Sequence, residues 1–181
     1  MKKTKNLFTI VVLNLIVLTS FGQTNFKWDI VTESLDKNKS ELYSQSKLFV
    51  SEMWKSAQDV IQNDDKEAGI ILIKGLNVQN LYYQMNDHRW TFSYTVKFLM
   101  KDNRCRVIID NVHCVGARVA QYEWPHMPVA DSYPEKKGLK ITGVNKKRYS
   151  KIMSSLKQEL QSIADSYADY LKKPLVDDSD W

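Results

Sequence analysis

Three histidines and two cysteines are the first residues of this chain to consider as metal ligands or as nucleophiles. The histidines are His88, His113 and His126, and no two of them have the four-residue helical spacing of a zinc protease. His113 and Cys114 are adjacent, so their side chains would diverge on a strand. The sequence also lacks a Cys-x-x-Cys pair. We therefore predict neither a metal site nor a bound cofactor.

A cluster of carboxylates, Asp64, Asp65 and Glu67, would supply a general acid and a general base if an enclosed site held it. Carboxylates in such a polar turn are more often solvated, and the Gly-x-Ser-x-Gly and Ser-x-x-Lys motifs of hydrolases are absent from the sequence. The stretch "DDSD" near the C-terminus lacks the glycine and the distal glutamate of a calcium loop. A hydrolase-like enzyme with an unrecognised active site is the alternative to a non-catalytic protein.

The two cysteines, Cys105 and Cys114, lie nine residues apart on one predicted strand. Strict alternation along a strand would place them on opposite faces and about 30 Å apart. A disulfide requires Cα atoms within about 7 Å. We predict that both thiols are free, with Cys105 in the core and Cys114 partly exposed at the strand end.

The elements that position these residues are clearest in the stretch "RWTFSYTVKFLMKDNRCRVIIDNVHC". Large apolar side chains alternate with polar ones from Trp90 to Lys101, which predicts a strand with one buried face. A two-residue turn at Asp102 and Asn103 then predicts a hairpin. The resulting register pairs Met100 with Cys105, Phe98 with Val107, and Val96 with Ile109.

The opposite face of this hairpin is mostly polar, with some apolar residues among the polar ones. Its predicted members are Thr91, Ser93, Thr95, Lys97, Lys101, Arg104, Arg106 and Asp110, together with Leu99, Ile108 and Val112. Apolar patches of this kind mark partner sites when they are exposed. The candidate partner surface comprises Lys97, Leu99, Arg106 and Ile108, with Tyr122 and Trp124 from the proline-rich loop "YEWPHMP". The alternative is that residues 116–144 or the C-terminal tail fold over this patch and complete the core.

The N-terminal half of the remaining chain predicts a strand, a helix and a second strand. Residues 26–33 alternate and predict the first strand. A helical period follows, from an N-cap at Ser40 to about Asn63. A charged turn and Gly69, which can adopt a positive φ, lead to an apolar strand at residues 70–73 that we expect to be covered on both faces.

The C-terminal half predicts an edge strand near residues 119–124, a long loop, and an amphipathic helix that starts at Asn145 and is stopped by Pro174. The order is β-α-β-β-β-(β)-α. The fold class is therefore α+β: a curved antiparallel sheet with both α-helices packed on one face.

The N-terminus has the three parts of a secretory signal peptide in order. Basic residues in "MKKTK" precede an apolar run at residues 7–18, and the small residues Ser20 and Gly22 follow. We expect cleavage after residue 22, a single domain at residues 23–173, and a polar tail at residues 174–181. The residue directly after the expected cleavage site is Gln23 and not a cysteine, so a lipoprotein is not expected. The mature chain would be periplasmic or secreted, without a transmembrane segment.

The net charge of +5 falls to +2 without the three lysines of the signal. A charge this small, and aromatic rings expected to face the core, argue against nucleic acid as a partner.

Several of these stretches together resemble one bacterial family. The pair Met53-Trp54, the stretch "DDKEAGIILIKG", and the aromatic strand leading into "KDNRCRVIID" are similar to an exported domain of unknown function, family 4468, which has a TATA-binding-protein-like fold. The resemblance spans about residues 27–115. It implies a fold and an exported location but no catalytic residues, and the fold name does not imply DNA binding. We therefore expect a non-catalytic interaction module that binds an envelope protein, a glycan or a lipid.

Overall fold

The computed structural model describes residues 26–33, 35–83, 86–119, 122–124, 129 and 145–174, and the side chains of all of these except residues 83, 86, 87, 119 and 122–124. The expected signal peptide, the start of the mature chain, most of the loop at residues 116–144, and residues 175–181 of the expected tail lie outside this part of the chain.

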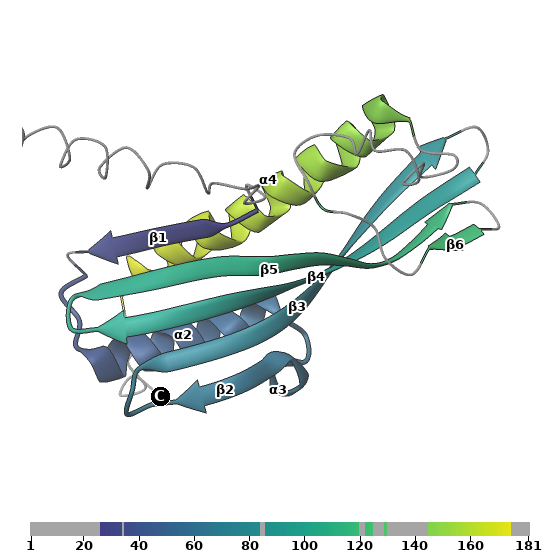
Figure 1. The fold of residues 1–181 in the computed structure, drawn as a ribbon. Coiled ribbons are helices and arrows are strands. Elements are labelled where there is room, and N and C mark those ends of the chain that lie inside the picture. The colour runs from purple at the N-terminus through teal and green to yellow at the C-terminus, as the bar shows by residue number, and fades with distance from the viewer. Residues whose placement is uncertain are drawn as a thin grey trace, which may run out of the picture.

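The described residues form one antiparallel sheet and its helices. The elements are β1 (Trp28–Glu33), α2 (Lys39–Met53), α3 (Ala57–Val60), β2 (Ile61–Asp65), β3 (Ile70–Tyr83), β4 (Asn86–Lys101), β5 (Arg104–Val119), β6 (Tyr122–Trp124) and α4 (Lys146–Leu171). The strand order is β1-β5-β4-β3-β2, and β6 pairs with β5. Helices α2 and α4 both lie behind the sheet in Figure 1. This arrangement confirms the predicted α+β fold with both long helices on one face.

The hairpin formed by β4 and β5 has the predicted register beside its turn. Met100 lies opposite Cys105, Phe98 opposite Val107, and Val96 opposite Ile109. At the turn itself Asn103 has a φ of 62°, a conformation that asparagine tolerates better than most residues. All six side chains of these pairs are buried.

Farther along β5, two irregularities shift the register and correct the prediction for the second cysteine. Asn111 has a φ of 56°, and the register shifts once beside it and again before Gly116. Each extra residue reverses the alternation of side chains between the two faces. Cys114 consequently lies opposite Phe92 and is buried, on the same face as Cys105, and Val112 packs against the core. The predicted placement of Cys114 and Val112 on the outer face is therefore wrong.

The first long helix is shorter than the sequence predicts. Its N-cap is Asn38 rather than Ser40: the Asn38 side chain accepts a hydrogen bond from the Glu41 amide, and the Glu41 carboxylate accepts one from the Asn38 amide. The helix ends at Met53, and Trp54 is extended. Residues 61–65 form β2, an edge strand that satisfies the outer backbone groups of β3. The predicted continuation of the helix to Asn63 is wrong because this pairing outweighs the helical period.

Strand β3 is correspondingly longer than predicted. It runs to Tyr83 and pairs with β4 over its whole length. Ile71 and Ile73 are fully buried, whereas Ile70 and Leu72 are half-buried. The expected cover on both faces is therefore complete on the core side of this strand and only partial on the other side. Gly69 has the expected positive φ of 67°, but it ends the turn between β2 and β3.

The core between the helices and the sheet is built around aromatic rings. Tyr167 of α4 lies 4.6 Å from the ring of Phe98 on β4 and 5.2 Å from the ring of Phe49 on α2, measured between centroids. Its hydroxyl lies 2.7 Å from the Ser46 hydroxyl. Helix α4 begins after the N-cap Asn145 and ends before Pro174, as predicted. None of the helices in the described part of the chain is both long and apolar enough to cross a membrane.

Candidate functional site

The candidate site is the open face, which we define as the side of the sheet that points away from α2 and α4 and toward the viewer in Figure 1. Two cross-strand rows lie on it near the β4–β5 turn. One row consists of Val31, Arg106, Leu99 and Ile70, and the next of Asp29, Ile108, Lys97 and Leu72. Their neighbours along each strand are the buried core residues, so alternation places these two rows outside.

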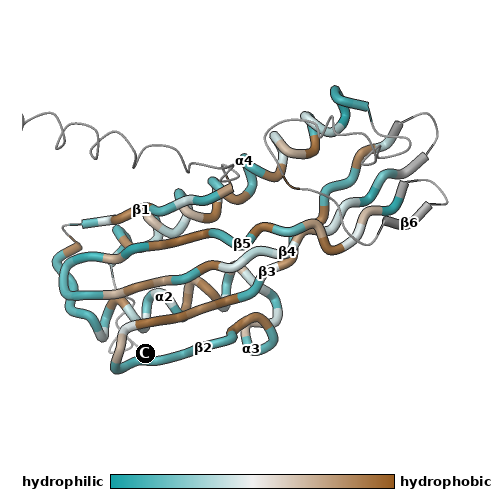
Figure 2. The backbone as a smooth tube through the Cα atoms, viewed as in Figure 1, coloured by the Kyte–Doolittle hydropathy of each residue, from teal (hydrophilic) through white to brown (hydrophobic). Residues whose placement is uncertain are grey.

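Aliphatic side chains gather in these rows. The side chains of Ile70, Leu72, Leu99 and Ile108 are half-buried, and Val31 is 50% exposed. Figure 2 shows that the hydrophobic stretches of β3, β4 and β5 run beside one another. A partly exposed aliphatic surface of this kind is characteristic of a contact site.

One cation of the open face is neutralised by a carboxylate. The guanidinium of Arg106 donates two hydrogen bonds to the carboxylate of Asp29, each 2.6 Å long. These bonds lower the pKa of Asp29 more than its partial burial raises it. The bidentate geometry fixes β1 against β5 and keeps this pair as a polar element among the aliphatic residues.

Three other cations of the open face have no such partner. Lys97, Lys101 and Arg104 are exposed, and within the described residues none of their side chains makes an ion pair or a hydrogen bond. Lys101 and Arg104 lie directly opposite each other across the turn. Glu33 on β1 is the cross-strand neighbour of Arg104, so the end of the open face beside the turn carries two cations and one carboxylate, an excess of positive charge.

A concavity of about 340 Å³ lies at this end of the open face. The described residues that line it are Val31, Leu99, Lys101, Arg104, Cys105 and Arg106. It combines an aliphatic floor with cationic groups, which are the components needed to bind a ligand that is apolar at one end and anionic at the other.

The structure brings four of the six predicted surface residues together. Lys97 is directly opposite Ile108, and Leu99 is directly opposite Arg106. The other two, Tyr122 and Trp124, lie on β6, which pairs with residues 117–119 at the far end of β5. About nine residues, or roughly 30 Å of strand, separate them from Ile108. The side chains of Tyr122 and Trp124 lie outside the described part of the chain.

Val31 was missed by the sequence reasoning. Its strand, β1, is followed in the chain by α2 yet pairs with β5, more than 70 residues away. Alternation within β1 predicts which residues share a face, but it does not reveal the neighbouring strand. Lys101 and Arg104 lie on the face that alternation predicts for them, and the sequence does not distinguish them from ordinary surface charges.

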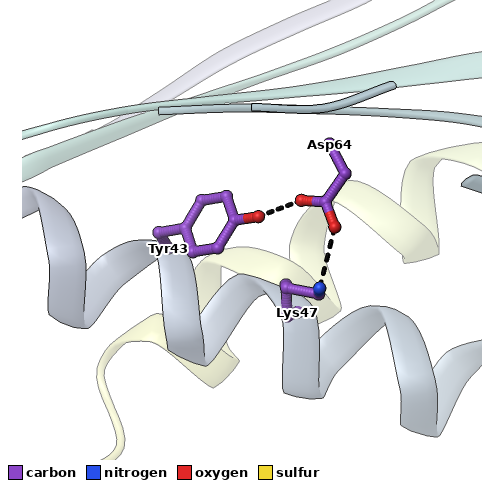
Figure 3. Close-up of polar contacts among 3 residues, drawn as sticks. All are labelled: Tyr43, Lys47 and Asp64. Atoms are coloured by element: carbon purple, nitrogen blue, oxygen red, sulfur yellow. Dashed lines mark hydrogen bonds and ion pairs between the residues drawn. The ribbon is translucent and has the colours of Figure 1, made fainter. Parts of the chain in front are cut away.

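On the other side of the sheet, a polar cluster joins α2 to β2 (Figure 3). Asp64 accepts a hydrogen bond from the hydroxyl of Tyr43 and another, 2.7 Å long, from the ammonium of Lys47. Burial and the hydrogen bond to Asp64 raise the pKa of Tyr43 to about 12. Partial burial raises the pKa of Asp64, but the bonds from Lys47 and Tyr43 outweigh it and leave that pKa lowered. A phenol this weakly acidic and a carboxylate that accepts two hydrogen bonds serve to attach the edge strand.

A cysteine and a serine that both contact Tyr167 are sealed in the core. Ser46, Cys105 and Tyr167 are each at most 2% exposed. Burial raises the pKa of the Cys105 thiol to about 11. Thiols act as nucleophiles in the thiolate form, so this cysteine is inert at neutral pH. Among the described residues, no group of three or more histidine, cysteine and carboxylate side chains is placed to hold a metal ion.

Comparison with known proteins gives a family and a fold. Residues 28–114 match the family described as a domain of unknown function (DUF4468) with TBP-like fold. A DUF4468 family protein from Bacteroides ovatus ATCC 8483 is 13% identical, with a TM-score of 0.57 over 86% of this chain and 92% of that one. A TBP-like protein from Parabacteroides distasonis ATCC 8503 is 11% identical, with a TM-score of 0.53 over 82% of this chain and 96% of that one. No curated protein matches the chain.

Proposed function

Because residues 28–114 belong to the DUF4468 family of domains of unknown function, which brings a TBP-like fold but no reaction, we propose a function from the geometry of the open face. The chain acts as a non-catalytic binding module, exported to the cell envelope or secreted, and the open face holds its partner. The observation that carries this proposal is the surface of partly exposed aliphatic residues beside three cations that are unpaired within the described residues.

Two features support binding rather than catalysis. The nucleophilic groups in the core are inaccessible, and the carboxylate of Asp64 is tied to a lysine and a tyrosine on the helical side of the sheet. The large rings of β4, such as Phe92 and Phe98, face the helices. Proteins that read nucleic acids on a sheet present such rings outward for stacking, so a protein, glycan or lipid partner suits this face better.

Site-specific photocrosslinking tests the proposed function. A photoreactive benzoylphenylalanine is placed at Val31, which is half-exposed on the open face, and separately at Ser154, which is exposed on α4. The full chain is then produced in a Bacteroides host and irradiated in intact cells. We expect discrete crosslinked products from position 31, and we expect Lys97→Glu to reduce them.

The control position decides how the products are interpreted. Crosslinks of equal yield from positions 31 and 154 would reflect random encounters and would contradict a dedicated binding face. The absence of products from position 31 would contradict it as well. Cell fractionation with N-terminal sequencing tests the exported location: a mature chain that begins near Gln23 outside the cytoplasm is the expected result.

A further inference from the structure

We infer that the concavity beside the β4–β5 turn binds a small amphiphilic anion, in which a carboxylate or a phosphate is attached to a short aliphatic chain. This inference rests on the proposed function, because it assigns the chemistry of a ligand to one end of the same open face. Three observations carry it: the arrangement of charge at the turn, the aliphatic floor beside it, and the size of the concavity.

The charge at the turn is arranged for an anion. Lys101 and Arg104 are directly opposite each other, and like charges at directly opposed positions destabilise a sheet. The turn's own carboxylate, Asp102, accepts a hydrogen bond of 2.8 Å from the backbone amide of Lys39 at the start of α2. Glu33 is the cross-strand neighbour of Arg104, but the two make no ion pair. A bound anion would relieve the repulsion between Lys101 and Arg104.

Two aliphatic residues flank Arg106 on the floor of the concavity. Leu99 and Val31 line it in the same row as Arg106, whose charge is already matched by Asp29. The apolar end of a ligand would therefore meet Leu99 and Val31, and its charged head would meet Lys101 and Arg104. The volume of about 340 Å³ is at the lower end of the range of roughly 300–1,000 Å³ found for ligand sites. This favours a small molecule with a short chain.

A second concavity, between α2 and α4, does not share this charge pattern. It measures about 430 Å³ and is lined by Phe49, Glu52, Met53, Ser166, Asp169, Tyr170 and Lys173. Glu52 accepts a hydrogen bond of 2.8 Å from Tyr170, and Asp169 pairs with Lys172 at 2.8 Å. Its charges are mixed and largely compensated, so it selects no ligand of a particular sign.

Calorimetric titration of the folded protein tests the inference with four probes. Octanoate and octyl phosphate carry the two anionic heads, octyl glucoside carries the same chain on a neutral head, and acetate carries a carboxylate without the chain. We expect saturable binding of octanoate, octyl phosphate or both, and much weaker binding of octyl glucoside and acetate. Whichever of the two anionic probes binds more tightly identifies the head group.

Matched variants locate the binding. Arg104→Glu should weaken the binding affinity for the anionic probe by about tenfold or more, because it removes a charged contact and adds a repulsion. Glu33→Gln should strengthen this binding, because it removes the nearest negative charge on β1. Lys151→Glu changes an exposed lysine on α4 and should leave binding unchanged. Melting curves of all three variants confirm that they are folded.

Three results would overturn the inference: no binding of either anionic probe up to about 1 mM, equal binding of octyl glucoside, or equal losses in Arg104→Glu and Lys151→Glu. Each would leave the photocrosslinks from position 31 unaffected, so failure of this inference is distinguishable from failure of the proposed binding face.

Discussion

Gly75 and Tyr94 lie directly opposite each other on β3 and β4, where the absence of a side chain on one strand makes room for a ring on the other. A Cβ atom added at Gly75 would lie 2.4 Å from the Tyr94 ring. The ring is buried, and burial raises the pKa of its hydroxyl. A glycine at this position is therefore required by packing.

Gly75→Ala should lower the free energy of unfolding by about 1–3 kcal/mol, because the ring must move out of a filled site. Gly116→Ala is the matched control, since a Cβ there would meet no atom within 4 Å. That change should leave stability the same or raise it slightly. Urea unfolding of both variants measures the difference, and equal effects would contradict the packing of Tyr94 over Gly75.

The stability contributed by Asp64 should depend on pH in a defined direction. Its pKa is lowered in the folded protein, so its contribution is present above the ordinary carboxyl range near 4 and is lost as pH falls through the lowered value. Asp64→Asn should lower the free energy of unfolding by about 1 kcal/mol at pH 7. This difference from the unmodified protein should shrink toward pH 3.

Urea unfolding at a series of pH values measures this trend. Asp59→Asn serves as the control, because Asp59 is exposed on α3 and its side chain contacts no partner in the described part of the chain. A difference between Asp64→Asn and the unmodified protein that stays constant from pH 7 to pH 3 would be inconsistent with the hydrogen bonds that Asp64 accepts from Tyr43 and Lys47.

At the scale of elements, strand β5 shows how far alternation can be followed. Its first half obeys strict alternation, and the predicted pairs are found there. Its second half does not, because the bulge at Asn111 adds a residue that pairs with nothing on β4. An asparagine inside an apolar strand is a weak signal for such a bulge, since most strand asparagines have negative φ.

The bulge predicts a specific preference at position 111. Asn111→Val should lower the free energy of unfolding by about 1–2 kcal/mol, because a β-branched residue is poorly accommodated at a φ of 56°. Asn111→Gly should cause no loss, since glycine adopts this conformation freely. Thermal or urea unfolding distinguishes the two, and a valine variant as stable as the glycine variant would contradict a bulge at this position.

The bulge also predicts the reactivity of the cysteines. Both thiols are buried on the core side of β5, at 2% and 3% exposure for Cys105 and Cys114. The native protein should react slowly with a thiol reagent such as dithionitrobenzoate, and the unfolded protein should release both thiols rapidly. One fast thiol in the native protein would favour the uninterrupted alternation that places Cys114 outside.

Helix α2 and strand β2 show why element boundaries were harder to predict than element types. The period of apolar residues continues past Met53 to Ala57 and Val60, so it favours one helix. The chain instead leaves the helix at Trp54 and pairs residues 61–65 with β3. Residues 61–65 become a strand because they satisfy backbone groups of β3 that would otherwise have no partner. Strand β3 comes later in the sequence, so the local helical period does not reveal this pairing.

For the whole molecule, the fold class could be predicted, and so could the part of the open face nearest the β4–β5 turn, where alternation is unbroken. Lys97, Leu99, Arg106 and Ile108 lie together as expected. The boundaries of the site could not be predicted. Val31 joins it through the pairing of β1 with β5, and β6 lies at the other end of β5, away from the predicted patch.

Hydroxyl-radical footprinting of the full chain, alone and in the presence of envelope extract, tests the binding role of the open face most directly. The account predicts that Leu99 and Ile108 are oxidised in the purified protein and become protected in the extract. Leu48, 49% exposed on α2, should be oxidised in both samples, and the buried Phe98 should be protected in both. Protection of Leu99 and Ile108 in the purified protein, or their unchanged oxidation in the extract, would contradict it.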